Sequence, residues 1–339
     1  MIVDAIRLVV EGVDLSAGQA RETMTEIMEG VALPSQIGSF LTALRMKGET
    51  VEEITAFASV MRAKVRQVSP GRHADVLDTC GTGGDGSGSF NISTAAALVA
   101  AGAGVPVAKH GNRSVSSSCG SADVLKELGV NLEAAPEVVE RCLDEAGICF
   151  IFAPLFHPAM KHAIGPRREV GIRTVFNVLG PLTNPAGARS QLLGVYTESL
   201  TETLAGVLSG LGSRKAYVVH GHGGLDEISL SGPTTISSLE AGKVTTSRIS
   251  PEEFGMDVRP QDAIRGGEAA ENAGIMRDIL SGKPGACRDA VVLNAGAAIS
   301  AYYQEMSIGD GIRQASAAID DGSAAAKLER LVKLTNGAV

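Results

Sequence analysis

The 339-residue sequence contains no tryptophan, and aromatic residues make up only 4% of it. This shortage of large rings, beside 41 glycines, favours tightly packed layers of helix on sheet over a β-sandwich. No run of about 18 apolar residues is present, and the N-terminus lacks the features of a signal peptide. We therefore expect neither a membrane span nor export.

Cysteine and positive charge are also in short supply. The five cysteines form neither a C-x-x-C pair nor the spacing of a zinc site, so we expect a cytoplasmic protein with reduced thiols. The net charge of −8 argues against a general nucleic-acid or membrane surface. It leaves a small anionic substrate open, because such a ligand responds to local charge.

The chain length predicts about two domains. Residues 1–65 have the apolar spacing of consecutive helices, with cap signals at Ser16 and Thr50 and a helix opened by Pro34. This segment is too short for a large core of its own. We predict that it packs against the rest of the chain or against a second copy.

Short apolar runs alternate with helical stretches after Pro70. We predict strands at residues 76–77, 105–108, 149–153, 192–195, 216–219 and 291–294. Such alternation is typical of an α/β domain with a mostly parallel sheet covered on both faces.

The most informative stretch follows the first of these strands. Five of the eight residues from Gly81 to Gly88 are glycine, so the backbone can take positive φ and approach a ligand closely. Helix-forming residues follow from Ile92. A strand, a glycine-rich loop and a helix N-terminus in this order indicate a phosphate-binding site. Asp85 within the loop points to a cation or a sugar hydroxyl between its carboxylate and the phosphate.

Two commoner phosphate-binding loops fit less well. The same residues match G-x-G-x-x-G, but the helix begins only near Asn91, and the next strand ends in Lys109 and His110 where an acid is needed. A Walker A loop requires Gly-Lys-Ser/Thr after the glycines, and this is missing. A dinucleotide fold and a P-loop are therefore disfavoured.

Two further polar segments follow predicted strands. Residues 109–118 carry two fixed cations, a histidine, an amide and four hydroxyls without an acid, a set that can donate to several phosphate oxygens. Asp226 and Glu227 lie on a glycine-rich loop, where adjacent carboxylates can converge on Mg²⁺. Because ligands of parallel sheets bind beyond the carboxyl ends of the strands, we predict that these loops meet at one edge.

Other polar groups are less specific. His220 and His222 suggest zinc, but no third ligand stands at a helpful spacing, so we interpret them as strand-end histidines. Arg167, Arg168 and Arg173 form a basic cluster that is either a solvated surface or a site for a carboxylate.

Taken together, these segments resemble the anthranilate phosphoribosyltransferase family. They run in family order across almost the whole chain. One departure is Ser89, where the family usually has threonine, and the hydroxyl is kept. The resemblance is carried by Gly81-Thr-Gly-Gly-Asp85, Asn91-Ile-Ser-Thr94, Lys109 through Leu125, Phe176 through Pro185, and Leu225-Asp-Glu227.

The resemblance implies a fold of the nucleoside phosphorylase and class IV phosphoribosyltransferase type. Residues 1–70 would form a small helical domain, completed by a helical segment near 165–190. Residues 71–339 would form the α/β domain that binds phosphoribosyl pyrophosphate. The resemblance also implies a homodimer built through the helical domain.

Site residues are implied in the same way, by motif. Anthranilate would contact Gly81, Asn112 and Arg167. Ser93, Asp226 and Glu227 would hold Mg²⁺, with about two ions per monomer. The implied ligands of phosphoribosyl pyrophosphate are Gly81, Gly84, Asp85, Ser89, Asn91, Ile92, Ser93, Thr94, Lys109, Ser117 and Ser121.

The implied activity is that of a glycosyltransferase of tryptophan biosynthesis, in which the anthranilate amine displaces pyrophosphate from the ribose. No general base is obviously required, and His110 is the nearest candidate. Two other classes stay open. A pyrimidine nucleoside phosphorylase-like enzyme is disfavoured by Asp226, Glu227 and Arg167. A non-catalytic nucleic-acid binder on the same fold is disfavoured by the acidic charge and the intact glycine loop.

Overall fold

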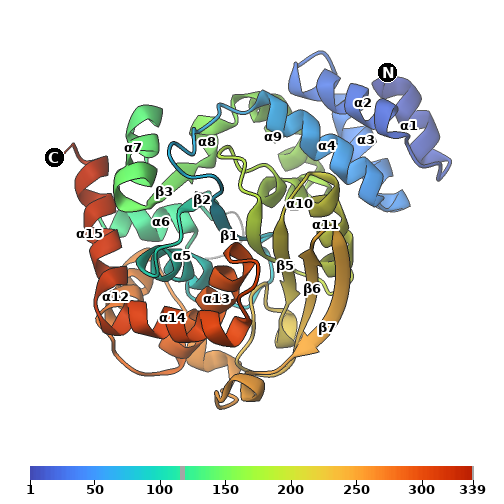
Figure 1. Cartoon of the computed structure of the whole chain (residues 1–339). Coiled ribbons are helices and arrows are strands. Elements are labelled where there is room, and N and C mark those ends of the chain that lie inside the picture. The colour runs from blue at the N-terminus through green and yellow to red at the C-terminus, as the bar shows by residue number, and fades with distance from the viewer. Residues whose placement is uncertain (115–118, 338–339) are drawn as a thin grey trace.

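The computed structural model describes residues 1–114 and 119–337. Four helices begin the chain and lie together at one end of the molecule (Figure 1). The predicted caps of the second and fourth helices are present, because Ser16 and Thr50 each accept a backbone N–H three residues on. The four helices are α1 (Ile2–Val10), α2 (Ala17–Met28), α3 (Pro34–Lys47) and α4 (Val51–Lys64).

A seven-stranded sheet with the order β3-β2-β1-β4-β5-β6-β7 forms the centre of the larger part. The first five strands are parallel, and β6 and β7 add an antiparallel hairpin at one side. The predicted fold class is therefore confirmed. The strands are β1 (Leu77–Gly81), β2 (Val107–Gly111), β3 (Ile148–Phe152), β4 (Ser190–Gly194), β5 (Lys215–His220), β6 (Thr234–Glu240) and β7 (Lys243–Ile249).

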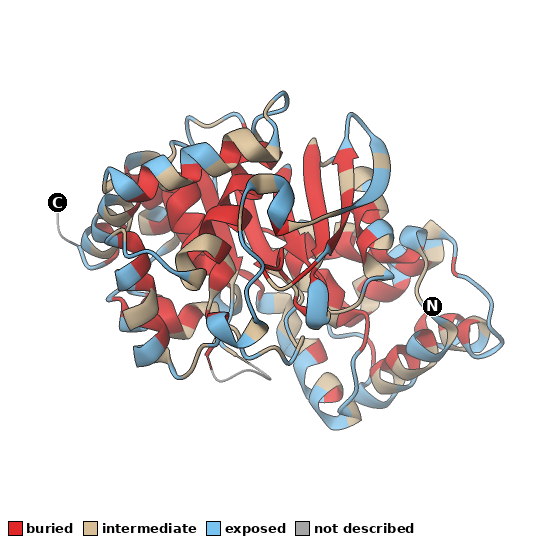
Figure 2. Cartoon of the chain, turned by 90° about the horizontal axis from the view of Figure 1, so that it is seen from below, coloured by how far each residue is buried: buried red, intermediate tan, exposed pale blue. Residues whose placement is uncertain are grey.

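Helices cover both faces of this sheet, and strands β1 to β6 are largely buried, whereas the edge strand β7 is mostly exposed (Figure 2). On one face α5 and α13 pack against β1, and on the other α11 packs against β5, β6 and β7. The helices after β1 are α5 (Ile92–Gly102), α6 (Ser121–Glu127), α7 (Pro136–Ala146), α8 (Ala153–Phe156), α9 (Lys161–Val170), α10 (Phe176–Leu179), α11 (Leu200–Gly210), α12 (Ala269–Leu280), α13 (Ala286–Tyr302), α14 (Ile308–Asp320) and α15 (Ser323–Thr335).

The N-terminal helices share a hydrophobic core with one face of the sheet. Phe40 of α3, Phe57 of α4 and Leu204 of α11 belong to one cluster of buried side chains. Ala163 of α9 and Phe176 of α10 belong to the same cluster, and α9 packs on α2 and α3. We propose that these later helices complete a helical domain whose boundary lies near residue 70.

One expected strand was wrong, and one hairpin was not expected. Residues 291–294 lie in α13 and not in a strand. Every residue from Ala290 to Ala301 is buried in this helix, so it has no polar face, and its short apolar runs resemble those of a buried strand. The β6–β7 hairpin was missed. It turns on Ala241 and Gly242, both at positive φ, and its strands are rich in Thr and Ser instead of large apolar residues.

Within the described ranges, no helix is both long and apolar enough to cross a bilayer.

The helix after the glycine loop starts where the sequence predicts, because α5 begins at Ile92 with Asn91 as its N-cap. The loops that carry polar motifs therefore stand on a rigid sheet with well-defined helix starts.

Candidate active site

Three polar loops meet at the carboxyl edge of the sheet, as predicted. The glycine loop follows β1, the loop with Asn112 follows β2, and the loop with Asp226 and Glu227 follows β5. In the sheet, β1 lies between β2 and β4, and β4 lies beside β5. The acidic loop crosses over the end of β4 to reach the glycine loop, and a hydrogen bond from Gly83 to Asp226 joins the two.

Asp226 lies directly against the ends of two strands. Its Oδ2 accepts a hydrogen bond from the Gly83 N–H at 2.8 Å. A Cβ on Gly81 would come within 2.5 Å of this oxygen, and a Cβ on Gly194 within 1.5 Å of the Asp226 carbonyl oxygen. Only glycine at both strand ends lets the acidic loop approach this closely. The sequence motifs pointed to Gly81, whereas the part played by Gly194 was missed.

Glu227 uses the start of α5. Its Oε1 accepts a hydrogen bond from the Ser93 N–H at 3.0 Å. Glu227 therefore satisfies one of the N–H groups that have no partner within the helix at its N-terminus. The sequence predicted acids on an open loop. Instead Glu227 is buried and Asp226 is half-buried, because the loop folds back over the strand ends.

Burial and mutual repulsion disfavour the charged forms of both acids. Desolvation, with the charge of Asp85 second, raises the pKa of Asp226 to about 7. Desolvation, with the charge of Asp226 second, raises the pKa of Glu227 to about 8, although Lys109 opposes this shift. A cation bound between these groups would relieve both effects.

Lys109 supplies a buried positive charge beside the acids. Its Nζ donates to the Thr79 carbonyl at 2.6 Å and lies 3.5 Å from the Ser93 Oγ. Burial lowers its pKa, and the charges of Asp78 and Glu227 oppose that shift. Burial raises the pKa of Asp78 to about 6. The site therefore places a cation next to the α5 N-terminus, where a phosphate would lie.

The glycine loop presents a curved backbone at this edge of the sheet. Gly83, Gly84, Gly86 and Gly88 all have positive φ, as expected from the sequence. Asp85 uses its two carboxylate oxygens to accept from the N–H groups of Ser87 and Asp226, at 3.2 and 3.4 Å.

Hydroxyl groups line the loop and the helix start. The Ser89 Oγ accepts a hydrogen bond from the Ser87 Oγ at 3.3 Å, within the loop itself. Ile92 is buried at the first position of α5. In the described part of the chain, the buried Thr94 Oγ1 has no hydrogen-bond partner.

Other residues that the resemblance marked are already engaged. Asn91 donates from Nδ2 to the Cys119 carbonyl, and its Oδ1 accepts from Asn272, so its side chain joins three segments. Asn112 is exposed after β2, and its carbonyl accepts from the Ser121 Oγ at 3.2 Å. Ser117 lies outside the described residues.

The basic cluster has three different environments. Arg167 of α9 stacks on Phe176, with its Cζ 5.1 Å from the ring centroid, and burial lowers its pKa. Arg168 is exposed. Arg173 donates a hydrogen bond to the Gly84 carbonyl, a contact that no sequence signal indicated. Of the three arginines, Arg173 therefore contacts the glycine loop.

His110 lies in a buried pair with His157, which sequence reasoning missed. Their Nε2 atoms are 3.0 Å apart and their ring centroids 4.8 Å apart. Burial first, and then repulsion by the charged forms of His157 and Lys109, lower the pKa of His110 to about 3. Burial lowers the pKa of His157 to about 4. Both rings are neutral near pH 7, and a base this weak argues against His110 as a proton acceptor.

The acidic donors fit a magnesium ion. Asp85, Asp226, Glu227 and the Ser93 hydroxyl offer only oxygen ligands, which Mg²⁺ prefers. Within the described ranges, no three or more histidine, cysteine or acidic residues are grouped so that they could hold a metal ion by themselves. A magnesium ion here would therefore take its remaining ligands from water and phosphate, as this ion commonly does.

The two strand-end histidines do not support a zinc site. The His220 Nδ1 makes a hydrogen bond with the Val195 carbonyl at 2.8 Å, and His222 is exposed. Their interpretation as ordinary residues at the end of β5 therefore stands.

Comparison with known proteins shows the family. The model of the glycosyl transferase family α/β domain matches residues 73–325, and that of its helical bundle domain matches residues 3–65. Anthranilate phosphoribosyltransferase from Geobacter sp. strain M21 is 55% identical, with 100% of both chains covered. The same enzyme from Pelotomaculum thermopropionicum is 56% identical, covering 99% of this chain and 97% of its own.

Solved structures agree with these relatives. The crystal structure of anthranilate phosphoribosyltransferase from Thermus thermophilus has a TM-score of 0.93 and 42% identity, with 98% of this chain and 100% of that chain covered. The enzyme from Saccharomyces cerevisiae, in complex with phosphoribosyl pyrophosphate and Mg, has a TM-score of 0.89 and 28% identity, with 99% and 98% covered. The chain therefore belongs to the anthranilate phosphoribosyltransferase family.

Proposed function

We propose that this protein transfers the phosphoribosyl group of phosphoribosyl pyrophosphate to the amine of anthranilate, releasing pyrophosphate, as a step of tryptophan biosynthesis. One observation carries the proposal. The glycine loop, buried Lys109 and the pair Asp226–Glu227 converge at one sheet edge, joined by the Gly83–Asp226 and Ser93–Glu227 hydrogen bonds. This set offers a polyanion cradle and a cation site within one pocket.

The phosphoribosyl substrate is held by the residues around the glycine loop. Backbone N–H groups of the loop and the free hydroxyl of Thr94 donate to phosphate oxygens, while Lys109 adds positive charge. The proposed ligands are Gly81, Gly84, Asp85, Ser89, Asn91, Ile92, Ser93, Thr94, Lys109, Ser117 and Ser121.

Magnesium would be held by Ser93, Asp226 and Glu227, and we propose about two ions per monomer. Magnesium bound to the pyrophosphate stabilises the negative charge that develops on this leaving group. The carboxylates of the buried Glu227 and the half-buried Asp226 each accept a backbone hydrogen bond, from Ser93 and Gly83, which leaves oxygen lone pairs for an ion. Lys109 balances part of their charge when the ion is absent.

Anthranilate is proposed to lie between the glycine loop and α9. The guanidinium of Arg167 can grip its carboxylate with two hydrogen bonds, and Gly81 and Asn112 complete the contacts. Stacking on Phe176 fixes the position of this guanidinium. The amine is then aligned with the anomeric carbon, and this alignment is the main contribution of the residues to the rate.

The amine attacks the anomeric carbon and pyrophosphate departs, with inversion. An aniline nitrogen is already a nucleophile and loses its proton readily after attack. His110 is not needed as a base, and its low pKa agrees with that. We propose that the chain instead provides electrostatic stabilisation of the leaving group and a fixed approach for the amine.

The activity is tested by following anthranilate fluorescence and pyrophosphate release with purified protein, phosphoribosyl pyrophosphate and Mg²⁺. Stoichiometric loss of anthranilate is expected. Phosphorolysis of uridine or thymidine is the matched control, and it should be absent. Phosphorolysis without anthranilate consumption would overturn the proposal in favour of a nucleoside phosphorylase.

The division of the pocket is tested at Arg167. Replacing it by alanine should lower kcat/KM for anthranilate. The loss of transition-state stabilisation should be about 2 to 4 kcal/mol, because a desolvated charge pair is lost. Calorimetric binding of phosphoribosyl pyrophosphate should change little. If that binding disappeared while the KM for anthranilate stayed constant, Arg167 would belong to the phosphate site.

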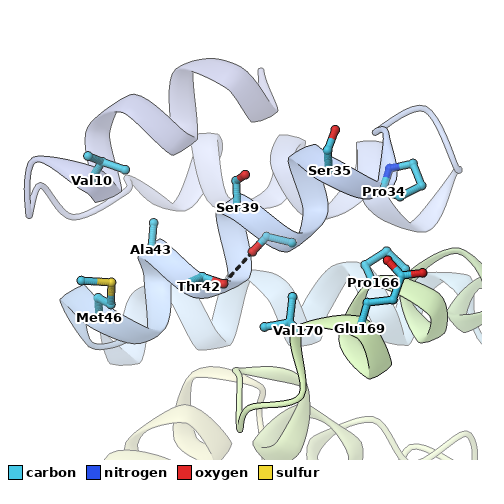
Figure 3. A pocket seen from close by; sticks show the side chains of 11 residues that line it. Val10, Pro34, Ser35, Ser39, Thr42, Ala43, Met46, Pro166, Glu169 and Val170 are labelled. Carbon is cyan, nitrogen blue, oxygen red and sulfur yellow. Dashed lines mark hydrogen bonds between the residues drawn. The ribbon is translucent and has the colours of Figure 1, made fainter.

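A homodimer is also proposed, with a second copy covering the helical domain. A groove of about 690 Å³ runs between α3 and α9, lined by small polar and apolar side chains (Figure 3). Met46 and Val10 at its edge are 83% and 68% exposed, which is unusual for large apolar residues. Sedimentation should give a dimer at micromolar concentration, and Met46→Asp should shift it toward monomer. A wild-type monomer would overturn this assignment.

We further propose that the enzyme acts in the cytoplasm. None of its five cysteines, which all lie among the described residues, is in a disulfide, and four of them are buried; this fits a reducing compartment. Fractionation of cells that produce the protein should place the activity with soluble cytoplasmic markers.

A further inference from the structure

Arg173 connects parts of the molecule that are far apart in the sequence. It lies between α9 and α10, and its Nη2 donates to the carbonyl oxygen of Gly84 in the glycine loop. Its guanidinium also lies over the ring of Tyr196, just after β4, with the Cζ 4.3 Å from the ring centroid. One side chain thus joins the α9–α10 connection to the loop and to the end of β4.

The first half of the loop is already anchored to the end of β4. The Thr82 N–H donates to the Gly194 carbonyl at 2.9 Å, and the Tyr196 N–H donates to the Thr82 Oγ1 at 3.1 Å. The next residues are mostly glycine and have large conformational freedom. The Gly83 N–H donates to the Asp226 Oδ2 at 2.8 Å, and Arg173 provides a further anchor at the next residue, through the Gly84 carbonyl.

This anchor also sets the direction of an N–H group. The chain contains no cis peptide bond among its described residues, so the Gly84 carbonyl and the Asp85 N–H point in opposite directions across one planar peptide. Fixing the carbonyl on Arg173 therefore turns the Asp85 N–H away from Arg173. The Asp85 carboxylate is held separately, by the N–H groups of Ser87 and Asp226.

We propose that Arg173 is a positioning residue that presets the glycine loop for phosphoribosyl pyrophosphate and ties it to the helix that carries Arg167. This inference rests on the proposed function. Arg173 acts through the Gly84–Asp85 peptide and not on the reacting atoms. Its loss should therefore weaken binding of the phosphoribosyl substrate, because the free loop must be ordered at the moment of binding.

The test compares Arg173→Ala with Arg168→Ala, which removes an equal charge from an exposed position on α9. Arg173→Ala should raise the KM and the calorimetric Kd for phosphoribosyl pyrophosphate, with Mg²⁺ present, by about tenfold, the size of one charge-assisted hydrogen bond. The kcat should stay within about twofold of wild type, since the reacting groups are untouched. Arg168→Ala should leave both constants unchanged.

Two more variants separate anchoring from charge. Arg173→Lys keeps the charge and one donor, so its rise in Kd should be smaller than that of the alanine variant. Tyr196→Leu removes the ring under the guanidinium but no charge, and it should raise the Kd in the same direction by about twofold to fivefold. Amide exchange of residues 82–88 in the ligand-free protein should be faster in Arg173→Ala, and the substrate should slow it again.

Several outcomes would overturn the inference. Equal losses in Arg168→Ala and Arg173→Ala, both removed by salt, would show that general charge attraction is responsible. A lower kcat with an unchanged Kd would place Arg173 in the chemical step. Unchanged loop exchange in Arg173→Ala would show that the loop needs no such anchor. An inactive wild-type protein would instead contradict the proposed function, so the two failures are distinguishable.

Discussion

Glu53 in the helical domain and Glu227 at the sheet edge are both buried, with 0% and 8% of their surfaces exposed. Their surroundings differ. Glu53 accepts from the N–H groups of Leu15 and Thr50 at 2.9 and 2.8 Å, and from the Lys47 Nζ at 2.9 Å. Its charge is fully compensated by groups of the chain, so it joins three segments of the helical domain.

Glu227 has far fewer partners. The Ser93 N–H donates to it at 3.0 Å, and Lys109 is near, but Asp226 and Asp85 add negative charge on the other side. A buried carboxylate with so little compensation lowers the stability of the free protein. The difference supports our proposal that Glu227 serves a bound cation, whereas Glu53 serves the fold.

The largest expected effect follows from removing Glu53. Glu53→Ala removes one of the two carboxylates that pair with the buried Lys47, leaving Asp14 at 2.6 Å, and it frees the backbone N–H groups of Leu15 and Thr50. The free energy of unfolding should fall by about 3 to 5 kcal/mol, measured by urea denaturation, because two N–H groups lose their acceptor and a buried ion pair is lost. Glu22→Ala, at an exposed position of α2, is the control and should change it by less than about 0.5 kcal/mol. Equal effects of the two variants would show that the Glu53 network does not hold the domain together.

Unlike Glu53→Ala, Glu227→Gln should lower the activity without lowering the stability. The amide still accepts from Ser93 but no longer carries charge for a cation. Turnover should fall by at least about 100-fold, or about 2.7 kcal/mol, in an assay across a magnesium titration. The free energy of unfolding should not decrease. An active variant, or one as destabilised as Glu53→Ala, would remove the contrast between the two acids.

The sequence indicated the motifs of the site better than the residues that hold those motifs in place. The glycine loop and Asp226–Glu227 could be found because glycine clusters and paired acids after strands are local patterns. The contacts of Gly194 and Arg173 could not be found, although the sequence marked Arg173 as part of a basic cluster. Each matters only because the fold brings it against another segment, Gly194 against the acidic loop and Arg173 against Gly84. Long-range contacts of this kind leave no periodic signal in one sequence.

The same limit applies to the fold. The caps of α2 and α4 and the start of α5 were predictable, since each depends on a few neighbouring residues. The helix α13 was not, because burial on all sides removes the polar face that reveals a helix. Sequence reasoning therefore succeeds where local chemistry decides and fails where packing decides.

A third prediction concerns pH and sharpens the comparison. The raised pKa values of Asp226 and Glu227 mean that the folded protein keeps protons which the unfolded chain releases. The stability from these protonated forms is complete below their ordinary pKa values near 4, and it is lost as the pH rises through about 7 and 8. Unfolding in magnesium-free buffer should become easier over that range.

The measurement is urea denaturation at pH 6.5 and 8.5 in a chelating buffer. The loss of unfolding free energy between these values should be about 2 kcal/mol smaller in Glu227→Gln than in wild type. The histidine pair does not interfere. The lowered pKa values of His110 and His157 make their contribution complete above about pH 6.5, and it is lost only toward pH 4 and 3. If wild type and Glu227→Gln lost the same amount of unfolding free energy between these pH values, burial would not raise the pKa of Glu227.

The smallest expected effect is stabilisation of the substrate-free protein by Mg²⁺ alone. Because the ion would bind the folded site and not the unfolded chain, magnesium at ten times its Kd should raise the free energy of unfolding by about 1.4 kcal/mol. The gain should increase from pH 6.5 to 8.5, since binding requires deprotonated acids. Glu227→Gln should lose it, whereas Glu53→Gln should keep it, starting from a lower stability. If magnesium stabilised Glu227→Gln as much as wild type, the ion would bind elsewhere, and the low compensation of Glu227 would need another explanation.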